Sequence, residues 1–357
     1  MWKINISAAY RTYKFTDKFI KDILLWAYRN RGFSTHEEIL KSQMSEQLRA
    51  LVNYKKYGNK FKDSMLVLSQ CRQIGSVLNS FNVYTKKYHL ILRGKILPPK
   101  QLSDKTLGEI RDTFDYFYTA VLKSKYFWEI YNPGGTQKSK KQVREEQGKD
   151  RVCPYCDQIY LSADSKSNMD HFLPISQFPF LSIHWANLVV ACSICNGILV
   201  KNKDWHIPVL HPYYDNIEKI LYFSFDRKHN MVQVKTQICI PYVRKGKLRG
   251  GNFIDLLKLN KSYQGVWAEV EDERNSLDDQ VQKSYQEFKD QLLTEKTSLE
   301  ILKTAVGERE MYHKGKKRKK IFSKMKWDYG KEYMKMEGKE YIEFLRKEQK
   351  EMLAKTE

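Results

Sequence analysis

The chain has 357 residues, which is enough for a sizeable core and for two or three structural units. Hydrophobic residues make up 41% of the sequence and the formal net charge is +21. No apolar run approaches the roughly 20 residues of a membrane span, and none stands at the start of the sequence. These features exclude a membrane-spanning class, favour a cytoplasmic protein without a membrane partner, and indicate a polyanionic partner.

The positive charge is uneven along the chain. Residues 1–150 carry a net +14, residues 151–300 are neutral, and residues 301–357 carry a net +7. This distribution favours basic flanks that bind phosphates and a central segment that performs the chemistry. The alternative is that the lysine-rich helices of the flanks are simply solvated faces.

Residues 1–150 have mainly helical apolar spacing. Thr16 is positioned to cap one helix, Thr35 and Glu38 form a capping box for another, and Ser103 opens a third. The spacing over residues 61–92 fits helix or strand. The charged, apolar-poor run from Asn132 to Asp150 is typical of a linker.

The segment from residue 151 onward differs in character. Residues 221–225 and 231–235 alternate between apolar and polar side chains like a β-hairpin. Helical spacing then returns, with one long helix expected from about Tyr263 to Ala305 and an amphipathic helix over 327–353. The basic run 314–320 is either a phosphate-binding patch or a disordered hinge.

Four cysteines stand in two Cys-x-x-Cys pairs, Cys153 with Cys156 and Cys192 with Cys195. Pairs at this separation, without a secretory signal, predict one tetrahedral structural zinc site rather than disulfides. Such a zinc would close the segment between the pairs into a stiff loop.

Polar residues suited to hydrolysis lie within or beside that loop. Asp170 and His171 stand in a predicted strand at 168–172, and Asn187 begins a second strand at 187–191. Cys192 is expected to begin a helix that carries Asn196. Taken singly, Asp170-His171 would be an ordinary strand end and either asparagine a turn residue. Their order relative to the two cysteine pairs favours a catalytic site.

These motifs resemble the HNH endonuclease family over about residues 152–212. The resemblance implies an α+β fold in which a central zinc-stapled ββα-metal unit is flanked by mainly helical regions. We therefore expect a basic helical domain at 1–150, a nuclease domain with its hairpin at 151–260, and a basic helical region at 261–357.

The resemblance also implies roles for individual residues. Asp170 and Asn196 would bind one catalytic Mg²⁺ or Mn²⁺, His171 would be the general base, and Asn187 would orient its imidazole. The residue types agree with this, since carboxylate and amide oxygens suit magnesium and histidine titrates near neutral pH. The chain would thus hydrolyse DNA phosphodiester bonds.

One position departs from the family pattern. Members commonly carry Asn-x-x-Lys in the last helix, where the lysine lies near the phosphate, but Leu199 occupies that place here. Lys201 or Lys203 would have to reach the phosphate instead. Further candidates for nucleic-acid contacts lie in the tyrosine-rich N-terminal flank and are Lys55, Lys56, Lys86 and Lys87.

The order of segments after the motif is similar to the HNH nucleases of retron-associated and Septu-type antiphage systems. That similarity implies a defence effector that works with an ATPase partner, and the basic N-terminal flank would bind either DNA or an acidic face of that partner. Two other functions remain open from the residues alone. They are an RNase of the same fold and a non-catalytic, zinc-containing nucleic-acid-binding module.

Overall fold

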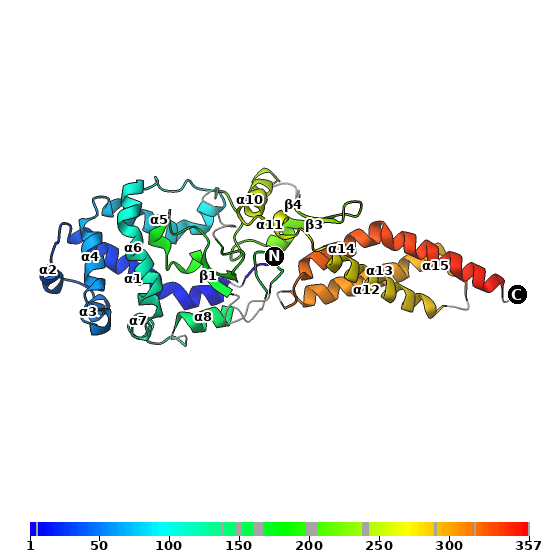
Figure 1. Cartoon of the computed structure of the whole chain (residues 1–357), viewed down its shortest axis with the longest axis horizontal. Helices are drawn as coiled ribbons and strands as arrows, with labels where there is room; N and C mark the ends of the chain where they lie inside the picture. The colour runs from blue at the N-terminus through cyan, green and yellow to red at the C-terminus, as the bar shows by residue number, and fades with distance from the viewer. Residues whose placement is uncertain are drawn as a thin grey trace. The chain divides into compact units, whose positions relative to one another are not determined.

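The computed structural model shows an α+β chain that is mostly helical and has two small sheets (Figure 1), which confirms this part of the expected fold class. The structure describes residues 1–4, 6–136, 139–147, 152–159, 167–197, 206–237, 243–288, 291–317 and 319–355. The side chains of residues 6–13, 147, 167 and 243–246 are not described.

The chain forms two compact units. One, here called the helical unit, comprises Ile4–Asp150 and Leu161–Asp215. The other, here called the bundle unit, comprises Met1–Lys3, Arg151–Tyr160 and Asn216–Glu357.

The helical unit contains helices α1 to α8 and the strands β1 and β2. In chain order its elements are α1 (Ile6–Arg29), α2 (His36–Lys41), α3 (Glu46–Val52), the 3₁₀ turn η1 (Lys55–Tyr57), α4 (Lys60–Gln70), α5 (Ile74–Leu92), α6 (Asp104–Thr119), the 3₁₀ turn η2 (Val121–Lys123), α7 (Lys125–Tyr131), α8 (Lys140–Gln147), β1 (Ser167–His171), the 3₁₀ turns η4 (Pro179–Leu181) and η5 (Trp185–Asn187), and β2 (Leu188–Cys192).

Aromatic side chains fill the centre of this unit. The centroid of the Phe19 ring on α1 lies 5.2 Å from that of Phe117 on α6 and 5.1 Å from that of Phe127 on α7. All three side chains are buried. Edge-to-face packing of this kind adds to the free energy gained from burying the rings. Phe19 on α1 therefore packs α1 against α6 and α7.

Two of the three predicted helix starts are confirmed. Thr35 and Glu38 form the capping box of α2, and the Ser103 hydroxyl accepts the Thr106 amide at the start of α6. The predicted cap at Thr16 is wrong, because α1 continues through that position from Ile6. The Thr16 hydroxyl is buried and donates instead to the carbonyl of Ile183 at 2.6 Å.

The segment expected to be a linker contains a helix. Residues 140–147 form α8, and Val143 on it is buried at 1% exposure. The sequence signal was weak because the helix has one apolar side chain among eight residues, so most of its surface faces charge or solvent. α8 packs against β1 and η2.

The two strands of the helical unit form an antiparallel pair in which Asp170 lies opposite Val189 and His171 opposite Leu188. Both strands agree with the sequence prediction. The helix expected at Cys192 is not present over the described residues 192–197, which form a turn closed by a hydrogen bond from the Asn196 amide to the Cys192 carbonyl at 3.0 Å.

The bundle unit joins a hairpin to a set of helices. Its elements are α9 (Ile217–Ile220), β3 (Leu221–Asp226), β4 (Met231–Thr236), α10 (Val243–Leu256), α11 (Leu259–Ser262), α12 (Trp267–Gln286), α13 (Glu295–Gly315), α14 (Ser323–Lys335) and α15 (Glu337–Ala354). β3 and β4 pair antiparallel, which confirms the predicted hairpin.

Two long helices expected in this unit are each interrupted. α12 ends at Gln286 and α13 begins after Thr294, whose hydroxyl accepts the Thr297 amide. α14 and α15 are separated by Met336, whose backbone is not helical. The break between α12 and α13 lets the chain reverse, so that the apolar faces of the two helices pack together. The break at Met336 does not reverse the chain, because Gly330 lies near Val306, Gly338 near Leu302, and Gln349 donates to the carbonyls of Phe288 and Gln291, so that α14 and α15 follow α13 in one direction.

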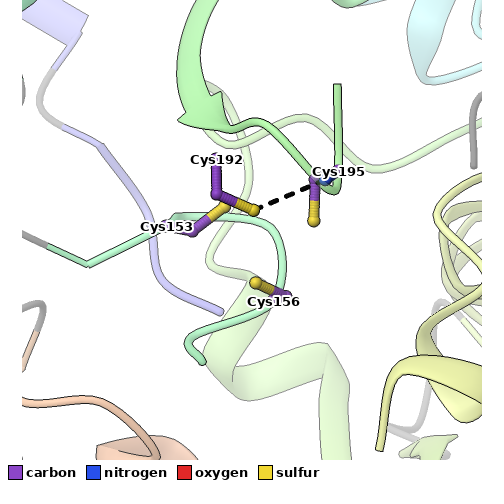
Figure 2. Close-up of side chains that lie close together, drawn as sticks. All are labelled: Cys153, Cys156, Cys192 and Cys195. Atoms are coloured by element: carbon purple, nitrogen blue, oxygen red, sulfur yellow. Dashed lines mark hydrogen bonds between the residues drawn. The ribbon is translucent and has the colours of Figure 1, made fainter. Parts of the chain in front are cut away.

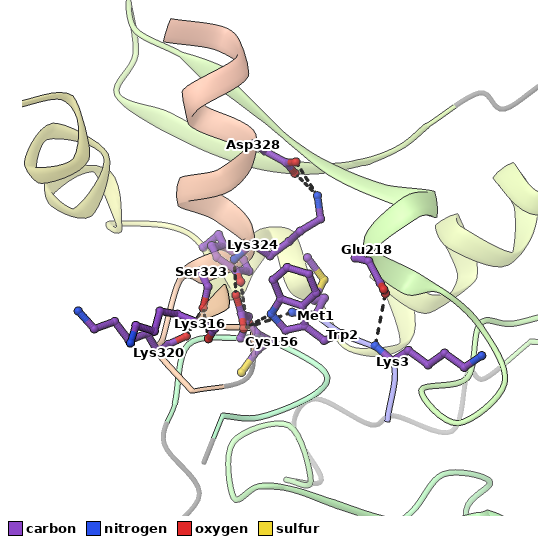
Figure 3. A network of polar contacts seen from close by, with 12 residues as sticks. Met1, Trp2, Lys3, Cys156, Glu218, Lys316, Lys320, Ser323, Lys324 and Asp328 are labelled. Atoms are coloured by element: carbon purple, nitrogen blue, oxygen red, sulfur yellow. Dashed lines mark hydrogen bonds and ion pairs between the residues drawn. The ribbon is translucent and has the colours of Figure 1, made fainter. Parts of the chain in front are cut away.

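Asp157 anchors the turn after Cys156 within the bundle unit, in the region where Figure 3 labels Cys156, Trp2 and Lys324. Its buried carboxylate accepts the indole N–H of Trp2 at 2.9 Å and the backbone N–H of Lys324 at 2.8 Å. Its carbonyl accepts the Phe322 amide at 2.7 Å, and the Tyr263 hydroxyl donates to the Cys156 carbonyl. The ordering of this turn therefore depends on α14 and α11.

Within the described residues, no helix is both long enough and apolar enough to cross a membrane.

Candidate active site

The four motif cysteines lie together (Figure 2). Cys153, Cys156, Cys192 and Cys195 are all buried, all are free of disulfide bonds, and their sulfur atoms all lie within 4.8 Å of one another. The Cys195 amide donates to the Cys192 sulfur at 3.4 Å.

The cluster fits a tetrahedral metal ion. Zinc–thiolate bonds of about 2.3 Å place the four sulfurs about 3.8 Å apart, within the observed spread. Buried thiolates need compensation of their charge, and an amide that donates to sulfur is one source of it. The four cysteines could therefore bind a metal such as zinc, as the sequence predicted.

His171 lies at the end of β1 and is half-buried. Its Nε2 is 2.8 Å from the carbonyl oxygen of Ser182. A carbonyl can only accept, so Nε2 carries the proton and Nδ1 is the basic nitrogen of the neutral ring. The centroid of the Tyr118 ring on α6 lies 4.4 Å from the centroid of the imidazole. The geometry thus fixes both the tautomer and the position of the ring.

Asn187 uses its whole amide group to hold the loop that carries Ser182. Its oxygen accepts the hydroxyl of Tyr88 at 2.8 Å and the amide of Leu173 at 2.7 Å. Its nitrogen donates to the carbonyls of Leu173 at 3.1 Å and Leu181 at 3.3 Å. Because both lone pairs and both protons are used, Asn187 makes no direct hydrogen bond to His171. Any orientation of the imidazole by Asn187 is indirect and acts through Leu181 and its neighbour Ser182.

The two residues expected to bind magnesium differ in exposure. Asp170 precedes His171 in β1 and is buried, with 2% of its surface exposed. The pKa of Tyr118 is raised mainly by the burial of Tyr118 itself and, to a smaller extent, by the negative charge of Asp170. Asn196 is half-buried, and it lines the same cavity as His171.

That cavity has a volume of about 540 Å³ and lies entirely within the helical unit. Besides His171 and Asn196, it is lined by Asn168, Met169, Ile175, Asp115, Tyr118, Lys123, Lys140, Lys141 and Arg144. The last six come from α6, η2 and α8 and were not among the sequence-predicted site residues. The usable signal was the spacing of Lys140, Lys141 and Arg144 around the apolar Val143.

The predicted nucleic-acid contacts are not gathered at this cavity. Lys55, Lys56, Lys86 and Lys87 are exposed, and none of them is among the described residues that line it. Lys201 and Lys203 lie outside the described residues. Two tyrosines close to Lys86 and Lys87 in the sequence, Tyr84 and Tyr88, are buried core residues, so their rings are not exposed for stacking on bases.

Two known proteins share limited sequence similarity with this chain. Septu protein PtuB of Bacillus thuringiensis is 30% identical over 111 residues, which is 30% of this chain and 37% of the relative. Protein ea31 of Escherichia phage lambda is 37% identical over 67 residues, covering 18% of this chain and 21% of the relative. The matches thus span about a third or less of these relatives' lengths. No family model and no solved structure matches the chain.

We expect Asn187→Ala to lower the free energy of unfolding by about 2–4 kcal/mol, because the variant leaves the Tyr88 hydroxyl and the Leu173 amide buried without an acceptor. Urea unfolding followed by circular dichroism measures this change. Asn53→Ala, at an exposed position after α3, is the control and should change stability by less than about 0.5 kcal/mol. Equal midpoints for the two variants would contradict the role assigned to Asn187.

We expect the purified protein to contain one zinc ion per chain, measured by elemental analysis. Cys156→Ser should lower the zinc content and the thermal stability together, because the site contributes directly to folding. Cys71→Ser is the matched control, since Cys71 is also buried but lies outside the cluster. Zinc retained at one ion per chain after Cys156→Ser would refute the assignment.

Proposed function

We propose that this chain is a metal-dependent endonuclease of the HNH type that hydrolyses DNA phosphodiester bonds. The observation that carries the proposal is the imidazole of His171. Its tautomer is set by the Ser182 carbonyl, and it lines a cavity that also presents Asn196 and several cations. Such a site combines a base for water with positive charge for a phosphate.

The types of donor atom in Asp170 and Asn196 suit the expected divalent cation, and of the two Asn196 is among the described residues that line the cavity. The carboxylate of Asp170 and the amide oxygen of Asn196 are hard donors of the kind that Mg²⁺ and Mn²⁺ prefer. When bound, the cation would stabilise negative charge on the phosphate and on the leaving oxygen.

His171 acts as the general base in this proposal. Its Nδ1 removes a proton from a water molecule whose oxygen attacks phosphorus, the bond from phosphorus to the 3′ oxygen breaks, and the leaving 3′ oxygen takes a proton from solvent water. The products are 5′-phosphate and 3′-hydroxyl ends. The Ser182 carbonyl stabilises the imidazolium that forms, because it accepts the Nε2 proton throughout.

A defence role is the second part of the proposal. The similarity to Septu protein PtuB, together with the resemblance of the motif to Septu-type nucleases, supports an effector of an antiphage system that works with an ATPase partner. The exposed lysines of the helical unit, including Lys55 and Lys86, would then bind either DNA or that partner.

His171→Ala should lower the rate of plasmid cleavage with magnesium at least about 100-fold, because a positioned general base contributes 10²–10⁴-fold. DNA affinity and zinc content should be unchanged. His229→Ala, at an exposed hairpin position paired with Asp226, is the control and should cleave normally. Undiminished cleavage by His171→Ala would remove it from the base role.

Parallel digestion of duplex DNA, single-stranded DNA and structured RNA tests the substrate. RNA cleavage alone would replace the DNA assignment, and no cleavage of any substrate by the wild type would favour a binding module.

Cells that carry the gene with its neighbouring genes should form fewer plaques when challenged with phage. The His171→Ala version of the same locus should lose this protection while expressing the protein at the same level, and the His229→Ala version should keep it. Protection that survives the His171→Ala change would separate the defence role from nuclease activity.

A further inference from the structure

The cavity beside His171 has two chemically different walls. One wall comes from β1 and the turn after β2, and presents Asn168, His171 and Asn196. The other comes from α6, η2 and α8, and carries four cationic side chains: Lys123, Lys140, Lys141 and Arg144. Asp115 is the one carboxylate among the described residues that line the cavity. The excess of positive charge gives the cavity an electrostatic potential that favours an anion over a cation.

Lys140 is connected to His171 through a single aromatic ring. Its ammonium nitrogen lies 3.1 Å from the centroid of the Tyr118 ring, and the same ring packs at 4.4 Å from the imidazole. The Tyr118 hydroxyl donates to the carbonyl of Met169 at 2.8 Å, which fixes the ring against β1. The cation is therefore held near the general base by a rigid contact.

The surroundings of Lys140 oppose its charge in the absence of an anion. Burial, followed by the positive charges of Lys123 on η2 and Arg144 on α8, lowers the pKa of Lys140 to about 7. Asp115 on α6 is the one charge in that set that acts in the opposite direction. A bound anion would relieve the repulsion among these cations and raise the pKa again.

Helix α8 also offers cations in place of the lysine that the family pattern has at position 199. Leu199 occupies the position where a phosphate-contacting lysine is expected, so the last motif segment lacks that cation. α8 supplies cations from outside the motif, with Lys140 and Arg144 four residues apart and thus on one face of the helix.

We propose that Lys140 of α8, together with Lys123 and Arg144, binds a phosphate group of the nucleic-acid substrate and places it against His171. This inference rests on the proposed nuclease function and deepens it by naming a substrate-binding residue that lies outside the HNH motif. Tyr118 is a positioning residue, since it holds both Lys140 and the imidazole.

The test measures binding of a labelled DNA duplex to full-length protein by fluorescence anisotropy, in the His171→Ala background so that the duplex stays intact. Adding Lys140→Met should weaken binding about tenfold, as expected for the loss of one charge-assisted contact. It should also reduce, by about one, the magnitude of the slope of the logarithm of the binding constant against the logarithm of the salt concentration. The control is Lys283→Met on α12, which removes an exposed lysine of the bundle unit and should change neither quantity.

A pH series separates a charge contact from a structural effect. Affinity of the protein with Lys140 should fall between pH 7 and 9, because the free site loses its proton with a pKa of about 7. Lys140→Arg should keep its affinity over the same range, since a guanidinium stays protonated. This comparison also holds if Lys140→Met folds poorly, which its thermal midpoint would reveal.

The outcomes distinguish the two proposals. Wild-type affinity and salt slope in a folded Lys140→Met protein, or equal pH dependence for the Lys140 and Lys140→Arg proteins, would overturn the role of Lys140 whether or not His171 is required for cleavage. If the wild type cleaves nothing but Lys140→Met still loses affinity, the nuclease function fails and the phosphate site stands.

Discussion

The proposed site depends on one buried amide, that of Asn187. Its side chain makes four hydrogen bonds, to Tyr88 on α5 and to the backbone of Leu173 and Leu181 in the segment between β1 and β2. Buried polar groups are costly unless they are paired, so this arrangement has one favourable geometry. Ser182 follows Leu181, and its carbonyl holds the imidazole of His171. The position of the His171 imidazole is thus set through a residue, Asn187, that makes no hydrogen bond to it.

The same segment is held from the other side by α1. Thr16 donates to the carbonyl of Ile183, and Asp17 is 2.7 Å from Nδ1 of the buried His184. Together with Tyr88, these contacts make the N-terminal helices the scaffold of the segment that holds His171. The basic flank therefore has a structural role besides any binding of phosphates. Its exposed lysines stay available for DNA or for a partner, while its buried threonine and tyrosine side chains order the loop.

The cavity has His171 and Asn196 on one wall and the cationic side chains of η2 and α8 on the other. Tyr118 links them, since it contacts Lys140 on one side and His171 on the other. Its hydroxyl is occupied by the Met169 carbonyl, and burial raises its pKa, so it remains a neutral phenol that positions groups. In the proposed phosphate site, a bound anion would raise the pKa of Lys140, which its buried position and its cationic neighbours lower, so that anion binding and the charge of Lys140 would be coupled.

The sequence alone determined the elements whose signals are local. The cysteine pairs gathered into one cluster, the strands at β1 and β2 and the β3–β4 hairpin formed where alternation predicted them, and Thr35 and Ser103 capped their helices. Strand alternation, helix capping and the spacing within each Cys-x-x-Cys pair depend on neighbours within a few residues, so they can be read from the sequence. The two cysteine pairs are far apart in the sequence, and it is the fold that brings them together. The roles of Asp170, His171 and Asn196 stay predictions.

Tertiary structure decided the rest. It showed that Thr16 is a mid-helix residue bonded to Ile183, that Asn187 bonds the loop rather than the imidazole, and that the charged run at 140–147 is a helix lining the cavity at His171. Each of these depends on partners between 6 and 167 residues apart or on packing against β1. No periodicity encodes such pairings, because they arise when separate segments bury polar and charged groups against one another.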